Sequence, residues 1–260
     1  MRKFGFKFFS TNFEKYSSTI KECVEFATSK EDIFIELSTI NNTPKEEYLR
    51  IKQQLDGLEV RIHASYIGFD AGNREMEKQN REVLAKAQYA ADVLNSKSIV
   101  VHAGYGHTQK QLEEAGRQFK LFNDKRIVVE NLPYFDNNGD ELLVHSAEDV
   151  AYMMNESGCG FCFDFSHAKC SAVALNADLE KYLQDLFKLK PSVYHMCDGD
   201  IKSLQDTHLH FGEGNFPLEH YLNTYTDKNA YITMETGNGF EQQNDLRIKD
   251  YKFLKAKQKA

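Results

Sequence analysis

A series of short apolar runs, each ending in a histidine or a carboxylate, is the feature that most constrains the fold of this chain. The runs are LEVRIH, SIVVH, RIVVE, GFCFD, SVYH and AYITME, and they close on His63, His102, Glu130, Asp164, His195 and Glu235. Imidazole and carboxylate groups are the preferred ligands of Zn²⁺ and related metals. Residues scattered over a surface would not recur at strand ends in this way. The pattern predicts a shared metal site at one rim of a barrel.

The order of strand-like and helix-like segments predicts how such a rim would be built. Strand-like runs occur at about 3–9, 32–38, 58–64, 98–103, 126–131, 160–165, 192–197 and 230–235. Helical patterns lie between them, most clearly at 74–95 and more weakly at 14–29, 44–56, 109–123, 146–157, 178–189 and 243–256. Eight βα units in about 250 residues is the usual size of a (β/α)₈ barrel. We therefore predict a single (β/α)₈ TIM barrel domain over residues 1–260, with a doubly wound open sheet as the alternative.

Composition limits the classes of protein to which the chain can belong. Hydrophobic residues make up 41% and charged residues 27%, which is ordinary for a soluble domain. No apolar run approaches the roughly 20 residues of a membrane helix, and MRKFGFKFFS lacks the long apolar segment of a signal peptide. The five cysteines are an odd number, which favours reduced thiols. We expect a cytoplasmic protein with no membrane partner.

The net charge of -7 argues against a broad nucleic-acid-binding surface. Four of the candidate ligands are carboxylates, however, namely Glu130, Asp164, Asp206 and Glu235. Two or three divalent ions would make their pocket neutral or cationic. The local charge of the metal site then decides whether a phosphate can bind there.

Two short motifs add three further candidate ligands. In the first, Asp164 is followed three residues later by His167, so both can face one cavity at the rim; the alternative is that Asp164 only caps the next helix. In the second, Asp206 and His208 project to the same side of an extended loop and can share a metal. His210 has the same parity and competes with His208. The GEG sequence that follows predicts a tight backbone turn.

Other motifs point away from competing chemistries. The Cys159-x-x-Cys162 spacing lies inside a strand-like run, so we interpret both cysteines as core residues. The chain has no nucleophile elbow, no GxGxxG sequence and no P-loop, so no nucleotide cofactor is expected.

Taken in order, the motifs HASY, VVHAG, VENLP, FDFSHA, YHMCD, DTHLHFGEG and METG resemble endonuclease IV. That family contains zinc-dependent apurinic/apyrimidinic endonucleases and lies within the xylose-isomerase-like TIM barrel superfamily. The resemblance covers residues from about 60 to 240 and includes the D-x-H-x-x-x-G-E-G signature that runs from Asp206 to Gly214. It implies a DNA repair hydrolase that cleaves phosphodiester bonds at abasic sites.

The resemblance also implies three zinc ions, with Mn²⁺ as the alternative at one site. The first ion would be held by His63, His102 and Glu130, the second by Glu130, Asp164, His195 and Glu235, and the third by His167, Asp206 and His208. The implied catalytic carboxylates are Glu130, Asp164 and Glu235. Tyr66 and Ile67 match residues that the family uses at the abasic site. The ions would neutralise charge on the phosphoryl and leaving oxygens.

Three segments depart from the endonuclease IV pattern. The first strand reads GFKFFSTN without the family's His-Val-Ser, and the loop STINNTPKEE has no counterpart of its Arg-bearing DNA loop. The second strand, IFIELS, looks more like the sugar-isomerase branch. The alternative function is therefore a sugar isomerase or epimerase with one Mn²⁺ or Mg²⁺ held by Glu130, Asp164, His195 and Glu235. A non-catalytic metal-binding protein is a third interpretation.

Overall fold

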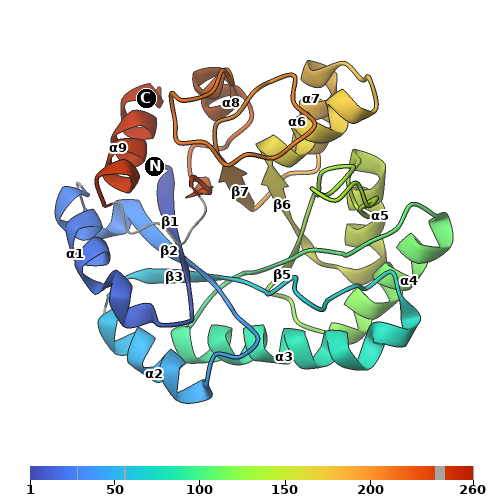
Figure 1. Cartoon of the computed structure of the whole chain (residues 1–260), viewed down its shortest axis with the longest axis horizontal. Helices are drawn as coiled ribbons and strands as arrows, with labels where there is room; N and C mark the ends of the chain where they lie inside the picture. Colours follow the sequence, from blue (N-terminus) through green and yellow to red (C-terminus); the bar gives the residue numbers. More distant parts are fainter. Residues whose placement is uncertain (28, 56, 238–243, 260) are drawn as a thin grey trace.

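The strands of the chain form a closed parallel barrel in the order β1 to β8, with β1 paired to β8 (Figure 1). The computed structural model describes residues 1–27, 29–55, 57–237 and 244–259. The strands are β1 Lys3–Phe9, β2 Ile33–Ser38, β3 Glu59–His63, β4 Ile99–Val101, β5 Ile127–Glu130, β6 Gly160–Asp164, β7 Val193–Met196 and β8 Tyr231–Met234. Closure confirms the predicted (β/α)₈ barrel and excludes the open sheet.

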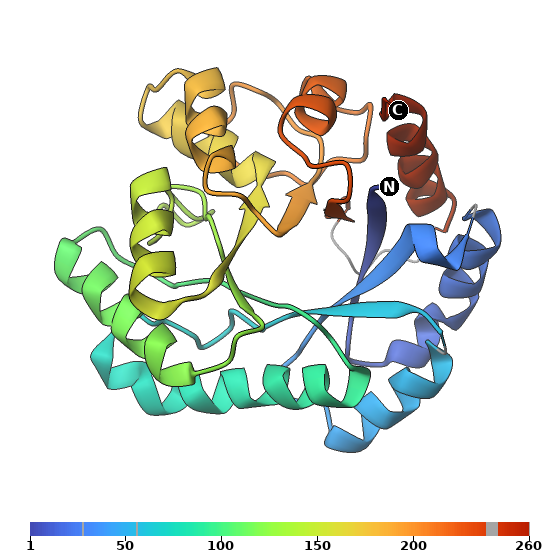
Figure 2. The same ribbon diagram turned by 180° about the vertical axis from the view of Figure 1, so that it is seen from behind.

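Helices surround the barrel as an outer ring, which both views show (Figures 1 and 2). They are α1 Ser17–Phe26, α2 Lys45–Gln54, α3 Glu77–Leu94, α4 Gln109–Phe122, α5 Ala147–Ser157, α6 Phe165–Ala174, α7 Leu179–Phe187, α8 Leu218–Thr224 and α9 Asn244–Lys257. Short 3₁₀ turns precede α1, β2 and α3 at Phe13–Tyr16, Lys30–Asp32 and Arg74–Met76. The last helix packs against the first, so the ring closes as the sheet does. No helix in the described part of the chain is long and apolar enough to cross a membrane.

The two faces of each strand meet different surroundings, because successive side chains of a strand point to opposite sides. In β1, the side chains of Phe4, Phe6 and Phe8 are buried in the core between the sheet and the helices. Gly5 lies on the other face, where an added Cβ would come within 2.3 Å of the Phe34 ring. Glycine at this position therefore leaves room for Phe34, which is fully buried inside the barrel.

The same alternation places charged side chains inside the barrel at the carboxyl ends of the strands. The register pairs Lys7 with Glu36 on β2 and Asp164 with His195 on β7. Below this layer, Val100, Val128, Cys162 and Val193 form one buried apolar cluster. The barrel thus carries a polar layer at its carboxyl end with an apolar cluster beneath it.

Most element boundaries agree with the sequence predictions to within two residues, but α6 and α8 were missed. In α6, every side chain from Phe165 to Ala172 is buried, so no polar face gives the helical period. Helix α8 has only seven residues, which is too short to establish a period. The region 74–95 divides into a 3₁₀ turn and α3, because α3 begins at Glu77.

Candidate metal centre

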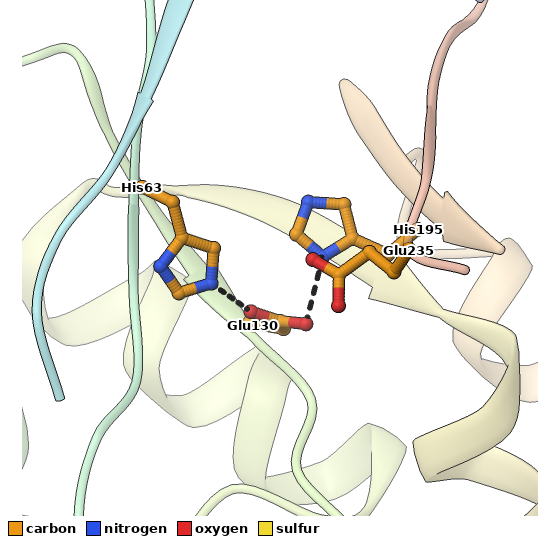
Figure 3. A group of neighbouring side chains, drawn as sticks. All are labelled: His63, Glu130, His195 and Glu235. Atoms are coloured by element: carbon orange, nitrogen blue, oxygen red, sulfur yellow. Dashed lines mark hydrogen bonds and ion pairs between the residues drawn. The ribbon is translucent and has the colours of Figure 1, made fainter. Parts of the chain in front are cut away.

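Glu130, at the end of β5, is the centre of an inner group of side chains that could hold a metal ion. Its carboxylate lies between His63 and His195 (Figure 3). Oε2 of Glu130 is 3.2 Å from Nε2 of His63, and Oε1 is 2.9 Å from Nδ1 of His195. Oε1 of Glu235 is also 2.9 Å from Nδ1 of His195. These four residues offer ligand atoms that all lie within 4.8 Å of one another.

A second group shares Glu130 and adds Asp164 and His167. Asp164 ends β6 and is also the N-cap of α6, where its Oδ1 accepts a hydrogen bond from the backbone N–H of His167 at 2.7 Å. The sequence left capping and metal binding as alternatives, but the geometry allows Asp164 to do both. The His167 side chain is buried, and its Nδ1 lies 3.5 Å from Oε1 of Glu130.

The outer group consists of His167, Asp206 and His208. Oδ2 of Asp206 is 3.2 Å from Nε2 of His167 and 2.5 Å from Nε2 of His208. Nε2 of His208 also lies 3.8 Å from Oε2 of Glu235. The outer group therefore adjoins the inner one, and the structure brings all three groups together at the carboxyl rim of the barrel.

His102, which directly follows β4, contacts the inner group from its edge. Its Nε2 is 3.0 Å from Oε2 of Glu130, the oxygen that His63 also contacts. The ring of Tyr66 stacks on the His102 ring, with centroids 5.4 Å apart and planes 12° from parallel. Tyr66 and its neighbour Ile67 are each 60% exposed. Two large side chains therefore stand at the mouth of the site, accessible to a ligand.

The nine predicted ligands thus lie together, although the groups differ from the ion-by-ion assignment. His63 shares its group with His195 and Glu235, whereas Asp164 groups with His167. His102 belongs to none of these groups of described residues, but it contacts their shared carboxylate and packs edge-on against the His63 ring at 5.0 Å between centroids.

Hydrogen bonds on the far side of two histidine rings fix which nitrogen faces the cavity. Nδ1 of His63 donates to the backbone oxygen of Ala64 at 2.9 Å, and Nδ1 of His167 donates to that of Asn131 at 2.9 Å. Each ring then directs Nε2 toward the carboxylates, and Nε2 is the nitrogen that would offer its lone pair to a metal ion bound among them. Asn131 also exchanges hydrogen bonds with the backbone of Asp164, at 2.8 and 2.9 Å. Such outer contacts orient ligands and set their tautomers in metal sites.

The electrostatics of the cavity favour a bound cation. Burial raises the pKa of Asp164 to about 7, with His167 opposing the shift and nearby carboxylates adding to it. Burial lowers the pKa of His102 to about 4, which leaves its ring neutral and able to act as a ligand. Burial alone would raise the pKa of Glu130, but His195 and His102 hold it well below its usual range. The donor set, the fixed tautomers and a carboxyl group that needs a positive neighbour together fit divalent metal ions.

The loop from Asp198 to Gly214 holds the outer group in place. Both carboxylate oxygens of Asp198 accept backbone hydrogen bonds, from Gly212 at 2.9 Å and from Phe216 at 3.1 Å. A Cβ on Gly214 would lie 2.4 Å from the backbone oxygen of Gly199. The GEG sequence therefore forms the predicted tight turn. Ser166 also donates to Oδ1 of Asp206 at 2.7 Å, which orients that carboxylate.

Two charged residues of the cavity, Lys7 and Glu36, were not predicted as site residues. Nζ of Lys7 forms an ion pair with Oε1 of Glu235, and Glu36 contacts His195. A signal for both exists in the sequence, because each is a charged residue flanked on both sides by apolar residues within its strand. All five cysteines are free and buried, which confirms that Cys159 and Cys162 are core residues.

The sequence of the chain is similar to those of known proteins. The profile of the family described as "Xylose isomerase-like TIM barrel" matches residues 14–257. The chain is 24% identical over 208 residues to a protein of Mycobacterium leprae named "Probable endonuclease 4", which covers 77% of this chain and 79% of that protein.

Two solved structures share the fold along nearly the whole chain. Endonuclease IV from Thermus thermophilus superimposes with a TM-score of 0.70 at 18% identity and covers 98% of both chains. A D-tagatose 3-epimerase-like protein gives a TM-score of 0.72 at 18% identity and covers 98% of this chain and 96% of that one. The fold is thus common to a nuclease and to an epimerase-like protein, and the choice between these activities depends on the site.

Proposed function

Because the chain belongs to the xylose isomerase-like TIM barrel family, we propose that it is a metal-dependent phosphodiester hydrolase that cleaves DNA at abasic sites. The observation that carries this proposal is the outer group of His167, Asp206 and His208 beside the inner group. A sugar isomerase needs only one ion, for which Glu130, Asp164, His195 and Glu235 would suffice. A second set of ligands next to the first supports a multinuclear centre.

The nine predicted ligands would hold three zinc ions, or two zinc ions and one Mn²⁺. Bound ions of this kind neutralise the oxygens of a phosphodiester and activate water for its hydrolysis. Glu130 is placed to act as the shared carboxylate, since its two oxygens contact different histidines. Asp164 and Glu235 complete the catalytic carboxylates around it.

The mouth of the site has the character needed to recognise a missing base. Tyr66 and Ile67 are exposed beside the ligands, and the Tyr66 ring is held by stacking on His102. An aromatic ring and a branched apolar side chain can fill the space that a lost base leaves in a duplex. We propose that these two residues contact the abasic nucleotide.

Isomerisation or epimerisation of a sugar at a single metal is the second candidate function. It is favoured by Lys7 and Glu36, which place an additional ion pair against Glu235 and His195 inside the barrel. It is also favoured by the net charge of -7, which offers little attraction to a DNA backbone.

Metal content and cleavage of an abasic-site oligonucleotide distinguish these candidates. We expect about three zinc ions per chain and strand cleavage that a chelator abolishes. His208→Ala should lose both an ion and cleavage, whereas His220→Ala, a control at an exposed histidine of α8, should lose neither. One hard metal ion per chain with turnover of a ketose and no cleavage would establish the sugar-active alternative. Chelator-resistant cleavage would exclude metal-dependent hydrolysis.

A further inference from the structure

We propose that Glu36 is a positioning residue for His195, and that Lys7 is the counter-ion that allows Glu36 to be buried charged beside the metal centre. This inference rests on the proposed metal centre and does not depend on which substrate the centre acts on. Neither residue is among the nine predicted ligands, and neither belongs to the groups of metal-binding side chains in the described part of the chain.

The contact between Glu36 and His195 determines the tautomer of the ring. Oε2 of the fully buried Glu36 lies 2.9 Å from Nε2 of His195 and also accepts a hydrogen bond from Thr233 Oγ1 at 2.8 Å. A carboxylate can only accept, so Nε2 must carry the hydrogen. Nδ1 faces carboxylate oxygens of Glu130 and Glu235 at 2.9 Å, so without a metal ion it carries a hydrogen as well. A metal ion bound at Nδ1 would replace that hydrogen and leave the one on Nε2, which Glu36 holds.

The outer nitrogen of His195 makes a hydrogen bond, as those of His63 and His167 do, but its partner carries a charge. His63 and His167 donate their outer hydrogen to neutral backbone oxygens, whereas His195 donates to a carboxylate. A carboxylate partner raises the basicity of a metal-bound imidazole as well as orienting it. We therefore expect His195 to be the most strongly oriented of these three ligands.

Lys7 accounts for the presence of a buried charge at position 36. Oε1 of Glu36 makes no hydrogen bond within the described part of the chain, and Nζ of Lys7 lies 3.7 Å from it. The Lys7 side chain is only 17% exposed. An ionised carboxylate without a positive neighbour is costly inside a protein. Glu36 and Lys7 also add opposite charges, so together they leave the net charge of the ligand set unchanged.

The strand pattern explains why the two residues meet. Lys7 and Glu36 are register partners on adjacent strands, and each occupies an inward position. The apolar neighbours on both strands, Phe6 and Phe8 on β1 and Ile35 and Leu37 on β2, are buried against the helices. The pair is therefore built into the barrel interior by the same alternation that places the ligands.

The main test is the zinc affinity of the Glu36→Gln variant, measured by competition with a chromophoric chelator. Glutamine keeps the size of the side chain but removes the charge and can present either an oxygen or an amide group to the ring. We expect zinc binding to weaken about 10- to 100-fold, the usual effect of altering an outer partner. The ¹⁵N shifts of His195 should show a change in the population with hydrogen on Nε2, which a purely structural role would not produce.

Lys7→Met tests the counter-ion role through stability in the presence of chelator. Glu36 and Glu235 would then both be left without this cation, and we expect Tm to fall by about 5 °C. The double variant Lys7→Met/Glu36→Gln should recover the part of this Tm that is due to Glu36, while Glu235 still lacks its cation, and should retain the weak zinc binding. The double variant also serves as the test of zinc affinity if Glu36→Gln alone does not fold.

Lys3 and Glu59 provide a matched control at the opposite end of the barrel. They form an ion pair of 2.8 Å between β1 and β3, and each side chain is 28% exposed. Lys3→Met and Glu59→Gln should leave zinc affinity and the His195 spectrum unchanged.

The outcomes separate this inference from the proposed function. Unchanged zinc affinity and an unchanged His195 spectrum in Glu36→Gln would overturn the positioning role while leaving the hydrolase intact. If Glu36→Gln binds zinc more weakly but the wild-type protein does not cleave abasic DNA, the proposed roles of Glu36 and Lys7 would be supported and only the proposed substrate would be overturned. Failure of the wild-type protein to bind zinc at all would overturn both.

Discussion

His210 is bonded to Asp250 on α9, with Nδ1 and Oδ2 2.7 Å apart, while His208, two residues earlier, contacts Asp206. Asp250 also accepts hydrogen bonds from the Thr236 hydroxyl at 2.5 Å and from the Phe211 backbone at 3.0 Å. His210 therefore joins the loop after β7 to the last helix. From their spacing in the sequence, His208 and His210 could not be told apart, because both project to the same side of an extended loop. In the fold, they contact different carboxylates.

This difference predicts opposite consequences for two alanine variants. His208→Ala should reduce the zinc content by about one ion per chain with little change in the stability of the metal-free protein. His210→Ala should keep the zinc content but lower the free energy of unfolding by about 1 to 3 kcal/mol, because it removes a partner of the buried Asp250. Elemental analysis and urea unfolding measure the two effects. An ion lost from His210→Ala and kept in His208→Ala would reverse the assignment.

Glu130→Gln should lower the cleavage of abasic DNA by about 10³-fold, because metal-ion catalysis depends on several kcal/mol of charge stabilisation around this carboxylate. The fold should persist, since glutamine has nearly the same volume. Single-turnover cleavage with a labelled oligonucleotide gives the rate, and circular dichroism checks the fold. Full activity in this variant would remove Glu130 from the mechanism.

The pH dependence of stability should include a contribution from Asp124, between α4 and β5. Hydrogen bonds from the Arg126 side chain lower the pKa of Asp124, and burial only partly offsets this. A carboxyl group with a lowered folded-state pKa stabilises the fold above its unfolded-state pKa of about 3.9, and the effect is lost as pH falls through the folded-state value.

Asp124→Asn should therefore cost about 1 kcal/mol at pH 7, allowing for partial exposure of the ion pair, and less below about pH 3.5. Urea unfolding of the wild type and the variant across this range gives the difference. A cost that stays constant with pH would show that Arg126 does not stabilise the charged form.

Duplex binding should depend only weakly on salt. The acidic chain has no arginine in the loop between β2 and α2, so few phosphates outside the metal pocket should be neutralised. Each neutralised phosphate contributes about -0.9 to the slope of log affinity against log salt. Titrating abasic duplex with metal-loaded Glu130→Gln over a salt series measures the slope. A slope of about -6 or steeper would reveal a basic footprint, and no binding at any salt would favour a small sugar or phosphoester.

The sequence was sufficient to predict the barrel and the grouping of the candidate ligands at its rim for a physical reason. Parallel strands covered on both faces give continuous apolar runs, so a polar residue at the end of a run is conspicuous, as at Glu130 and Asp164. The ligand motifs then indicated which residues should share a site. The ion assigned to each ligand remains a prediction, because spacing along the chain does not determine distances between side chains of different strands.

Lys7 and Glu36 were harder to recognise because they match no ligand motif. Their place in the site depends on the register between β1 and β2 and on the contact of Glu36 with the His195 ring, which comes from a strand far along the chain. Helix α6 was missed for a related reason. Its polar residues, such as Lys169, are buried by partners in distant loops and give no amphipathic pattern.

The ring of Phe34, which packs over Gly5, fills part of the barrel interior beneath the site. Phe34 packs edge-on against Tyr231 at 5.5 Å between centroids, and the guanidinium of Arg61 lies 3.4 Å above the Tyr231 ring. We therefore expect ions, water and reactants to enter and leave by the rim that carries Tyr66. A duplex lying across that rim would delay exchange of the ions beneath it, so chelator should strip metal more slowly from the DNA complex than from the free protein. A small sugar bound at the site would slow the removal of metal by chelator less than a duplex would.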